Sequence, residues 1–218
     1  KVKMFISTIA IILLFSICVS AQKVCLFIGA DPNTEPNAAY DPYMVDHLYS
    51  MGYSIEEVII NDVPLYSDED YADYDFLFTS ESVGSGSLEP LKEIPKPIMC
   101  SEGWASKPSA LAWSDPASAD NYVPEPVVIV DETGHPLAAG YNKGDVLDLC
   151  SDPAGLIVPH QPTVDIIPIA ALASDPSFML VYGVEAGTVN TLGLITKNRA
   201  AMVAIHEFGY PYLTDAAW

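Results

Sequence analysis

Short apolar segments alternate with polar segments of helical pattern along the first hundred residues, and this alternation constrains the fold most strongly. The segment Lys23–Ala30 (KVCLFIGA) is an almost continuous apolar run, typical of a strand that is buried on both faces. Three further strands are expected at Ser54–Ile60, Asp75–Thr79 and Pro97–Cys100. The segments between the strands are expected to be helical over Ala38–Met51, Tyr66–Tyr74 and Ser87–Ile94. This order predicts an α/β three-layer sandwich with a mainly parallel central sheet, because strand–helix–strand units place helices over both faces of a parallel sheet.

The second half of the chain follows a different pattern. Residues 101–126 are rich in Ser, Ala, Pro and Asp, and they contain Trp104 and Trp113. An ordered surface loop is expected there, because tryptophan side chains pack against other parts of a fold. Further strands are expected at Val127–Val130, Asp145–Cys150, Val164–Leu172, Phe178–Val184 and Arg199–His206. The pattern predicts a β-rich C-terminal part whose hairpins extend or flank the sheet.

Residues 1–21 have the pattern of a secretory signal peptide. Lys1 and Lys3 precede an apolar run from Ile9 to Val19, and small residues follow at Ser20-Ala21. The run is too short to span a bilayer comfortably. We therefore expect the mature protein to be a single α/β domain over residues 22–218, secreted to the extracellular space or the periplasm.

The chain is strongly acidic, with a net charge of −20. Removal of the signal peptide takes away two lysines and no acids, which changes the net charge to −22. Such a surface repels nucleic acid and anionic lipid, so neither partner is expected. No second apolar stretch approaches membrane length, and no membrane insertion is expected after signal removal.

The mature chain keeps three cysteines, and this odd number is not a disulfide framework. Cys25 and Cys100 lie in apolar runs and are interpreted as buried thiols. A single bridge between Cys100 and Cys150 remains an alternative, so the disulfide state stays open.

Candidate ligand-binding residues follow from the predicted sheet. Ligands of open parallel sheets bind at the carboxyl ends of the strands. The polar and aromatic residues expected there are Asp31, Ser80, Glu81, Glu102, Trp104, Asp131 and Glu207.

Ser82 is the candidate nucleophile of a catalytic alternative. The segment Ser80–Gly84 (SESVG) is half of a nucleophile elbow, with His206 or His135 available as a base. Glycines follow before the next helix, which relaxes the sharp turn that such an elbow needs. We favour the interpretation that these serines satisfy backbone groups at the strand end.

A metal centre is not predicted. The pair His206-Glu207, together with His135 and Asp131, could in principle ligate an ion, but none of these residues forms a compact i, i+4 helix pair. No cofactor is expected.

Several segments together resemble a known family. They are KVCLFIGADPN, DYDFLFTSESVGSG, PIMCSEGW, VDETGHPLAAGYNKGDV and the ending NRAAMVAIHEFGYPYLTDAAW. In this order they resemble a group of secreted bacterial domains, similar to the trehalose-utilisation-type (ThuA-like) branch of the class I glutamine amidotransferase-like fold. The resemblance covers about residues 23–218. It implies a flavodoxin-like sandwich whose final helix continues past Trp218, and a module within a longer extracellular protein.

The resemblance does not extend to the amidotransferase reaction. That reaction needs a cysteine at the elbow and a His-x-Glu pair, whereas this chain has Ser82 and an adjacent His206-Glu207. The leading prediction is a non-catalytic binding or accessory module toward carbohydrate or cell-surface components. A hydrolase using Ser82 with His206 or His135 is the alternative, and a metal-dependent enzyme is the second alternative.

Overall fold

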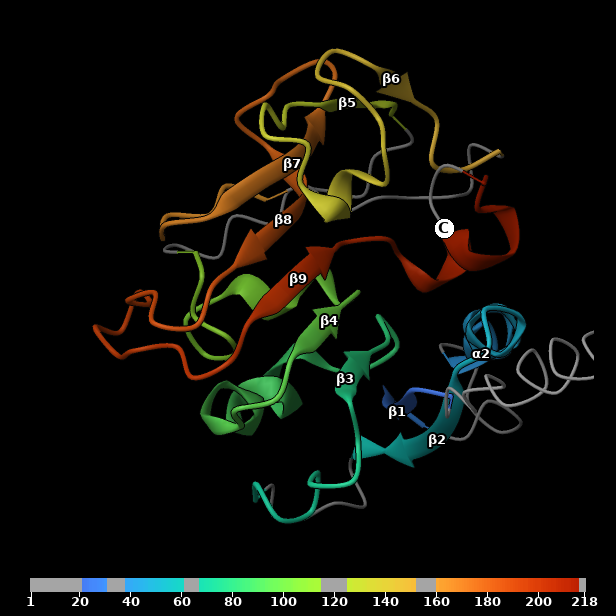
Figure 1. Ribbon diagram of the computed structural model, residues 1–218, viewed down its shortest axis with the longest axis vertical. Helices are drawn as coiled ribbons and strands as arrows, with labels where there is room; N and C mark the ends of the chain where they lie inside the picture. Colours follow the sequence, from blue (N-terminus) through green and yellow to red (C-terminus); the bar gives the residue numbers. More distant parts are fainter. Residues whose placement is uncertain (1–20, 31–37, 61–66, 115–124, 152–159, 216–218) are drawn as a thin grey trace, which may run out of the picture.

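The computed structural model describes residues 21–30, 38–60, 67–114, 125–151 and 160–215. Nine strands form one sheet in the order β2-β1-β3-β4-β9-β8-β7-β5-β6 (Figure 1). The strands are β1 Lys23–Ile28, β2 Ser54–Ile59, β3 Phe76–Thr79, β4 Ile98–Cys100, β5 Val127–Ile129, β6 Val146–Leu147, β7 Ile167–Leu172, β8 Met179–Val184 and β9 Ala200–Val203. The described helices are the α-helix α2 Asp41–Ser50 and the 3-10 helices η4 Ser85–Glu93, η5 Gly103–Ser106, η6 Pro136–Ala138 and η7 Glu207–Tyr212.

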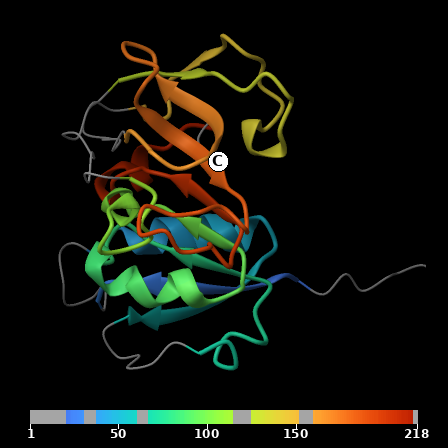
Figure 2. The same ribbon diagram turned by 90° about the vertical axis from the view of Figure 1, so that its left-hand side faces the viewer.

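The half of the sheet from β2 to β9 is parallel. β1 pairs with both β2 and β3, β3 pairs with β4, and β4 pairs with β9. The β1 residues Val24–Ile28 are all buried, as the apolar run predicts for a central strand covered on both sides. Seen from two directions, α2 and η7 lie on one side of this half and η4 and η5 on the other (Figures 1 and 2). The carboxyl ends of β1, β3, β4 and β9 therefore lie at one edge of the sheet.

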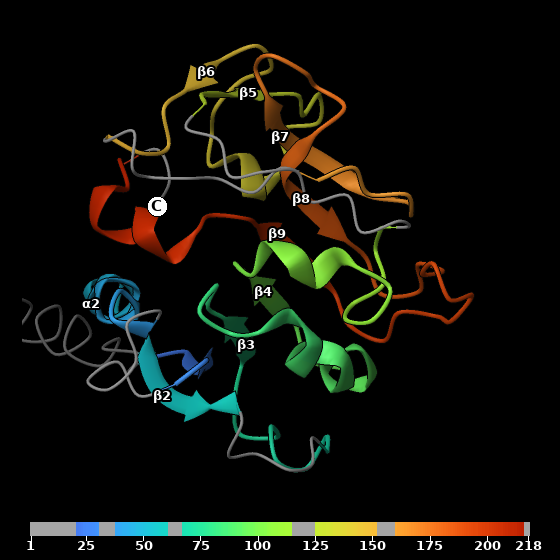
Figure 3. The same cartoon turned by 180° about the vertical axis from the view of Figure 1, so that it is seen from behind.

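The other half of the sheet is antiparallel, so the prediction of a mainly parallel, flavodoxin-like three-layer sandwich is wrong. β9 pairs antiparallel with β8, and the pairings of β8 with β7, β7 with β5, and β5 with β6 are antiparallel too. A parallel connection needs a crossover of about a dozen residues or more, but only residues 173–178 join β7 to β8. Viewed from behind, β5, β6, β7 and β8 lie together in the upper part of the molecule, above β9 (Figure 3).

Helices are also fewer and shorter than expected. The segment expected to be helical at Ser87–Ile94 lies, except for Ile94, in the 3-10 helix η4, which contains Pro90. Proline removes a backbone donor and disfavours continuation as an α-helix. Of the expected segment Tyr66–Tyr74, the described residues form turns. None of the helices in the described ranges combines the length and apolar character needed to cross a bilayer.

The three cysteines in the described part of the chain are present as thiols. Cys25 and Cys100 are buried and Cys150 is partly buried, and none of the three forms a disulfide. A bridge between Cys100 and Cys150 is therefore not formed, and the interpretation of Cys25 and Cys100 as buried thiols is confirmed.

Candidate functional site

The turn that follows β3 is fixed by a buried carboxylate from α2. Asp41, in the first turn of α2, is fully buried and accepts hydrogen bonds from the hydroxyls of Ser80 and Ser82, the latter at 2.7 Å. Ser82 Oγ also accepts the N–H of Gly29 at the end of β1, at 3.1 Å. Burial raises the pKa of Asp41 to about 6, although both serine hydrogen bonds oppose this shift. These contacts hold the ends of β1 and β3 against the start of α2.

Tyr210 connects η7 to the same turn. Its buried hydroxyl accepts the backbone N–H of Glu81 at 3.1 Å and lies 3.3 Å from Ser80 Oγ. Burial raises the pKa of Tyr210 above its ordinary value. Because η7 follows β9, this contact places the residues after β9 opposite the turn after β3.

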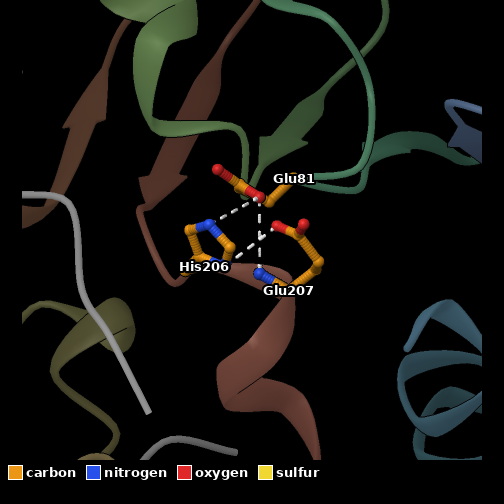
Figure 4. A group of neighbouring side chains, drawn as sticks. All are labelled: Glu81, His206 and Glu207. Atoms are coloured by element: carbon orange, nitrogen blue, oxygen red, sulfur yellow. Dashed lines mark hydrogen bonds and ion pairs between the residues drawn. The ribbon is translucent and has the colours of Figure 1, made fainter. Parts of the chain in front are cut away.

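Three buried side chains meet where these segments face each other: Glu81, His206 and Glu207 (Figure 4). His206 Nε2 lies 4.0 Å from Glu81 Oε2, and His206 Nδ1 lies 3.1 Å from Glu207 Oε2. The backbone N–H of Glu207 donates to Glu81 Oε2 at 3.4 Å. In Figure 4 the three side chains point toward a common centre, one from the turn after β3 and two from the segment after β9.

Burial governs the charge of this cluster. It lowers the pKa of His206 to about 4, so the imidazole is neutral at pH 7. It raises the pKa of Glu207 to about 7. His206 Nδ1 also accepts the N–H of Phe208 at 3.2 Å and thereby caps η7. The cluster is thus a neutral imidazole between two acidic groups with little access to water.

The residues after β4 lie at the same edge. Glu102 is 3 % exposed, and burial raises its pKa to about 8 against the opposing effect of Lys107 and a hydrogen bond from Ser85. Trp104 is half-buried in η5. Since β4 is bonded to both β3 and β9, Glu102 and Trp104 follow the strand between the two that carry the cluster.

The structure thus brings together most of the predicted site residues, namely Ser80, Glu81, Ser82, Glu102, Trp104, His206 and Glu207. Asp131 and His135 lie elsewhere, so the strand-end rule gathers only some of the predicted residues at this edge. β5 runs opposite to β7, so its carboxyl end points to the other edge of the sheet. Asp31 lies outside the described residues.

Asp131 and His135 have a local structural role at that other edge. The Asp131 carboxylate accepts the N–H of Thr133 at 3.0 Å and the N–H of His135 at 2.7 Å, which closes a turn. His135 lines a cavity of about 320 Å³ together with Pro97 and Arg199, from the amino ends of β4 and β9. The alternative metal set of Asp131, His135 and His206 is therefore divided between opposite edges.

Two residues at the edge where β1, β3, β4 and β9 end, Asp41 and Tyr210, could not be predicted from the sequence. The pair Asp41-Pro42 at a helix start is the only signal for Asp41, and an acid in the first helical turn is common for helix stability alone. Tyr210 carries no signal, because its role depends on where η7 lies in space.

Ser82 does not have the surroundings of an activated nucleophile among the described contacts. Its hydroxyl donates to Asp41, and its oxygen is occupied by the Gly29 N–H. A serine nucleophile instead needs a base, usually a histidine that a carboxylate orients.

Comparison with known proteins gives a structural relative. No family model matches the chain, and no curated protein matches it by sequence. A crystal structure of a protein from Bacteroides uniformis, described as ThuA-like, is similar in fold, with a TM-score of 0.51 and 10 % identity. The similarity covers 91 % of this chain and 87 % of that one. The chain therefore has a ThuA-like fold, in a form whose sheet is mixed.

The contact between Tyr210 and the Glu81 backbone gives a prediction for stability. Tyr210→Phe should lower the free energy of unfolding by about 1–3 kcal/mol, because it leaves the buried Glu81 N–H without its acceptor. Urea unfolding of the variant measures this loss. Tyr212→Phe is the matched control, since Tyr212 lies in the same helix and is exposed. Equal stability of the two variants would contradict the assigned role of Tyr210.

Proposed function

We propose that this protein is an exported binding or accessory module with a ThuA-like fold, and that it holds a neutral, hydroxyl-rich ligand of the carbohydrate type. The observation that carries the proposal is an exposed aromatic ring beside buried acids at the carboxyl edge. Phe208 is 40 % exposed, and its ring centre lies 4.5 Å from that of His206 and 5.2 Å from that of Tyr40.

Aromatic and acidic groups together suit such a ligand. The C–H face of a sugar ring is apolar and packs on an aromatic ring such as that of Phe208. Carboxylate oxygens, as in Glu81 and Glu207, accept hydrogen bonds from hydroxyl groups. Proteins commonly bind small ligands on apolar surface, with a few polar groups that fix the orientation of the ligand.

Charge argues against an anionic ligand. The chain carries 29 acidic and 9 basic residues, and the cluster itself holds two buried acids beside a neutral imidazole. A phosphate or carboxylate ligand would be repelled by this field. The proposal therefore concerns neutral sugars rather than sugar phosphates or uronic acids.

A non-catalytic role is supported by the position of Ser82. The Ser82 hydroxyl donates a hydrogen bond to Asp41, which also accepts one from Ser80. Ser82 further accepts the N–H of Gly29, so these contacts hold β1, β3 and α2 together. Export is part of the same proposal and rests on the signal-peptide pattern of residues 1–21. The place of the module in a longer extracellular protein rests on the family resemblance of residues 23–218.

Substitution of the exposed aromatic ring tests the proposal. Calorimetric titration with a panel of neutral oligosaccharides should find at least one that binds the wild type. Phe208→Ala should weaken this binding at least about tenfold, or about 1.4 kcal/mol. Tyr49→Ala, at a tyrosine that is 53 % exposed on α2, should leave the affinity unchanged.

Two outcomes would count against the proposal. The first is that no neutral oligosaccharide binds, or that both variants lose affinity equally. The second is cleavage of a panel member by the wild type, which would replace the binding module by an enzyme.

A further inference from the structure

We propose that Glu81, His206 and Glu207 form a site for one divalent transition-metal ion of the Mn²⁺ or Zn²⁺ type. This inference goes beyond the proposed ligand-binding function and does not depend on it. Each of the three residues offers one ligand atom, and these atoms all lie within 4.8 Å of one another.

The distance between His206 and Glu81 fits two ligands of one metal ion better than a hydrogen bond between the two side chains. The 4.0 Å between His206 Nε2 and Glu81 Oε2 is too long for a hydrogen bond. Metal–ligand bonds of about 2.0–2.2 Å bring two ligand atoms of one ion to about this separation or somewhat closer. The Glu207 carboxylate lies against the other ring nitrogen, with Oε2 3.1 Å from His206 Nδ1, and it joins the set because one ligand atom of each residue lies within 4.8 Å of the others.

The carboxylate of Glu207 gives an independent indication. The residue is only 4 % exposed, and its Oε2 has no hydrogen-bond donor among the described residues. The polar atom beside it is His206 Nδ1, which accepts the N–H of Phe208. Buried polar atoms are rarely left in this way, and a nearby cation would give the carboxylate oxygen the positive partner that it lacks.

Charge compensation points to the same occupant. In the described ranges, no lysine or arginine forms an ion pair with Glu81 or Glu207. Two carboxyl groups that are buried side by side, and that have no lysine or arginine of the described residues paired to them, offer a place where a cation fits. A divalent ion balances both carboxylates.

The donor set selects the kind of metal. One imidazole and two carboxylates suit Mn²⁺ and Zn²⁺, whereas Ca²⁺ prefers six to eight oxygen ligands. Three protein ligands leave coordination positions open for water or for a ligand hydroxyl. The segments that carry the ligands are held in place by Asp41 and Tyr210, which lie outside the ligand set.

Mn²⁺ titration followed by electron paramagnetic resonance tests the site. In 0.15 M salt, which screens weak binding to surface acids, the wild type should bind one Mn²⁺ per chain. Glu81→Gln and Glu207→Gln should each weaken binding at least about tenfold. Glu132→Gln, at an exposed acid that pairs with Lys143, should leave it unchanged.

A second measurement on the wild type alone avoids dependence on the folding of the variants. Pulsed resonance of bound Mn²⁺ should show coupling to a ¹⁴N nucleus, which surface carboxylates cannot supply. Absence of that coupling would overturn the proposal, as would equal Mn²⁺ binding by folded Glu81→Gln, Glu207→Gln and Glu132→Gln proteins. Oligosaccharide binding by a protein that takes no Mn²⁺ would refute the metal site while leaving the proposed function intact.

Discussion

Replacing Glu102 by glutamine should stabilise the protein at pH 8 and leave its stability near pH 4 almost unchanged. Burial raises the pKa of the folded-state carboxyl to about 8 from its ordinary value of 4.5. Below pH 4.5 the proton is bound in both the folded and the unfolded state. Between pH 4.5 and 8 the unfolded state loses the proton while the folded state keeps it, so the contribution of Glu102 to stability falls as the pH rises. Above pH 8 the loss is on the order of 5 kcal/mol.

Glutamine removes this loss because it has the shape of the protonated acid and can still bond to Ser85. Urea unfolding of wild type and Glu102→Gln at pH 4, 6 and 8 measures the difference, which should grow with pH. Glu57→Gln, at an exposed position of β2, should show no such growth. A constant difference for Glu102→Gln across this range would mean that Glu102 is not held in its neutral form by burial.

Gly29→Ala should have the other large effect, a loss of at least about 3 kcal/mol in the free energy of unfolding. A Cβ atom at Gly29 would lie 2.0 Å from the backbone oxygen of Ser82 and 2.7 Å from its carbonyl carbon. Backbone atoms cannot yield as a side chain can, so β1 and the turn after β3 would have to separate. Thermal or urea unfolding measures the loss.

Gly84→Ala is the matched control for that substitution. Gly84 lies two residues after Ser82, has an ordinary φ of −62°, and has nothing within 4 Å of an added Cβ. Its replacement should change stability little or raise it slightly by restricting the unfolded chain. If Gly29→Ala were as stable as Gly84→Ala, the close approach of the two backbones would be disproved.

The strands of the parallel half could be predicted from local sequence. The run Lys23–Ala30 contains β1 Lys23–Ile28, and Ser54–Ile60 contains β2 Ser54–Ile59. Apolar content marks a buried strand wherever it lies in the sheet. The direction of a strand could not be predicted in this way, because it depends on the length of the segments that connect it to its neighbours. Val127–Ile129 has the same composition as a parallel strand, but it pairs antiparallel with β7 and β6.

The residues of the candidate site also fall into those that local sequence predicts and those that depend on the fold. The sequence predicts that Glu81, His206 and Glu207 share an edge because β3 and β9 both end there, and they do. The same rule predicts Asp131 and His135 at that edge, and it fails for a reversed strand. The buried Asp41 and Tyr210 could not be predicted, since their partners come from distant segments.

The position of β9 in the sheet has a consequence for how the protein assembles. This strand follows all other described strands in the chain, yet it lies between β4 and β8, where it joins the parallel half to the antiparallel half. Until residues 200–203 are synthesised, β4 and β8 each have an unpaired edge, and unpaired edges invite aggregation. His206 and Glu207 follow directly after β9. The nascent chain therefore closes its sheet and completes its acidic cluster in a single late step, which favours slow folding with many contacts distant in sequence.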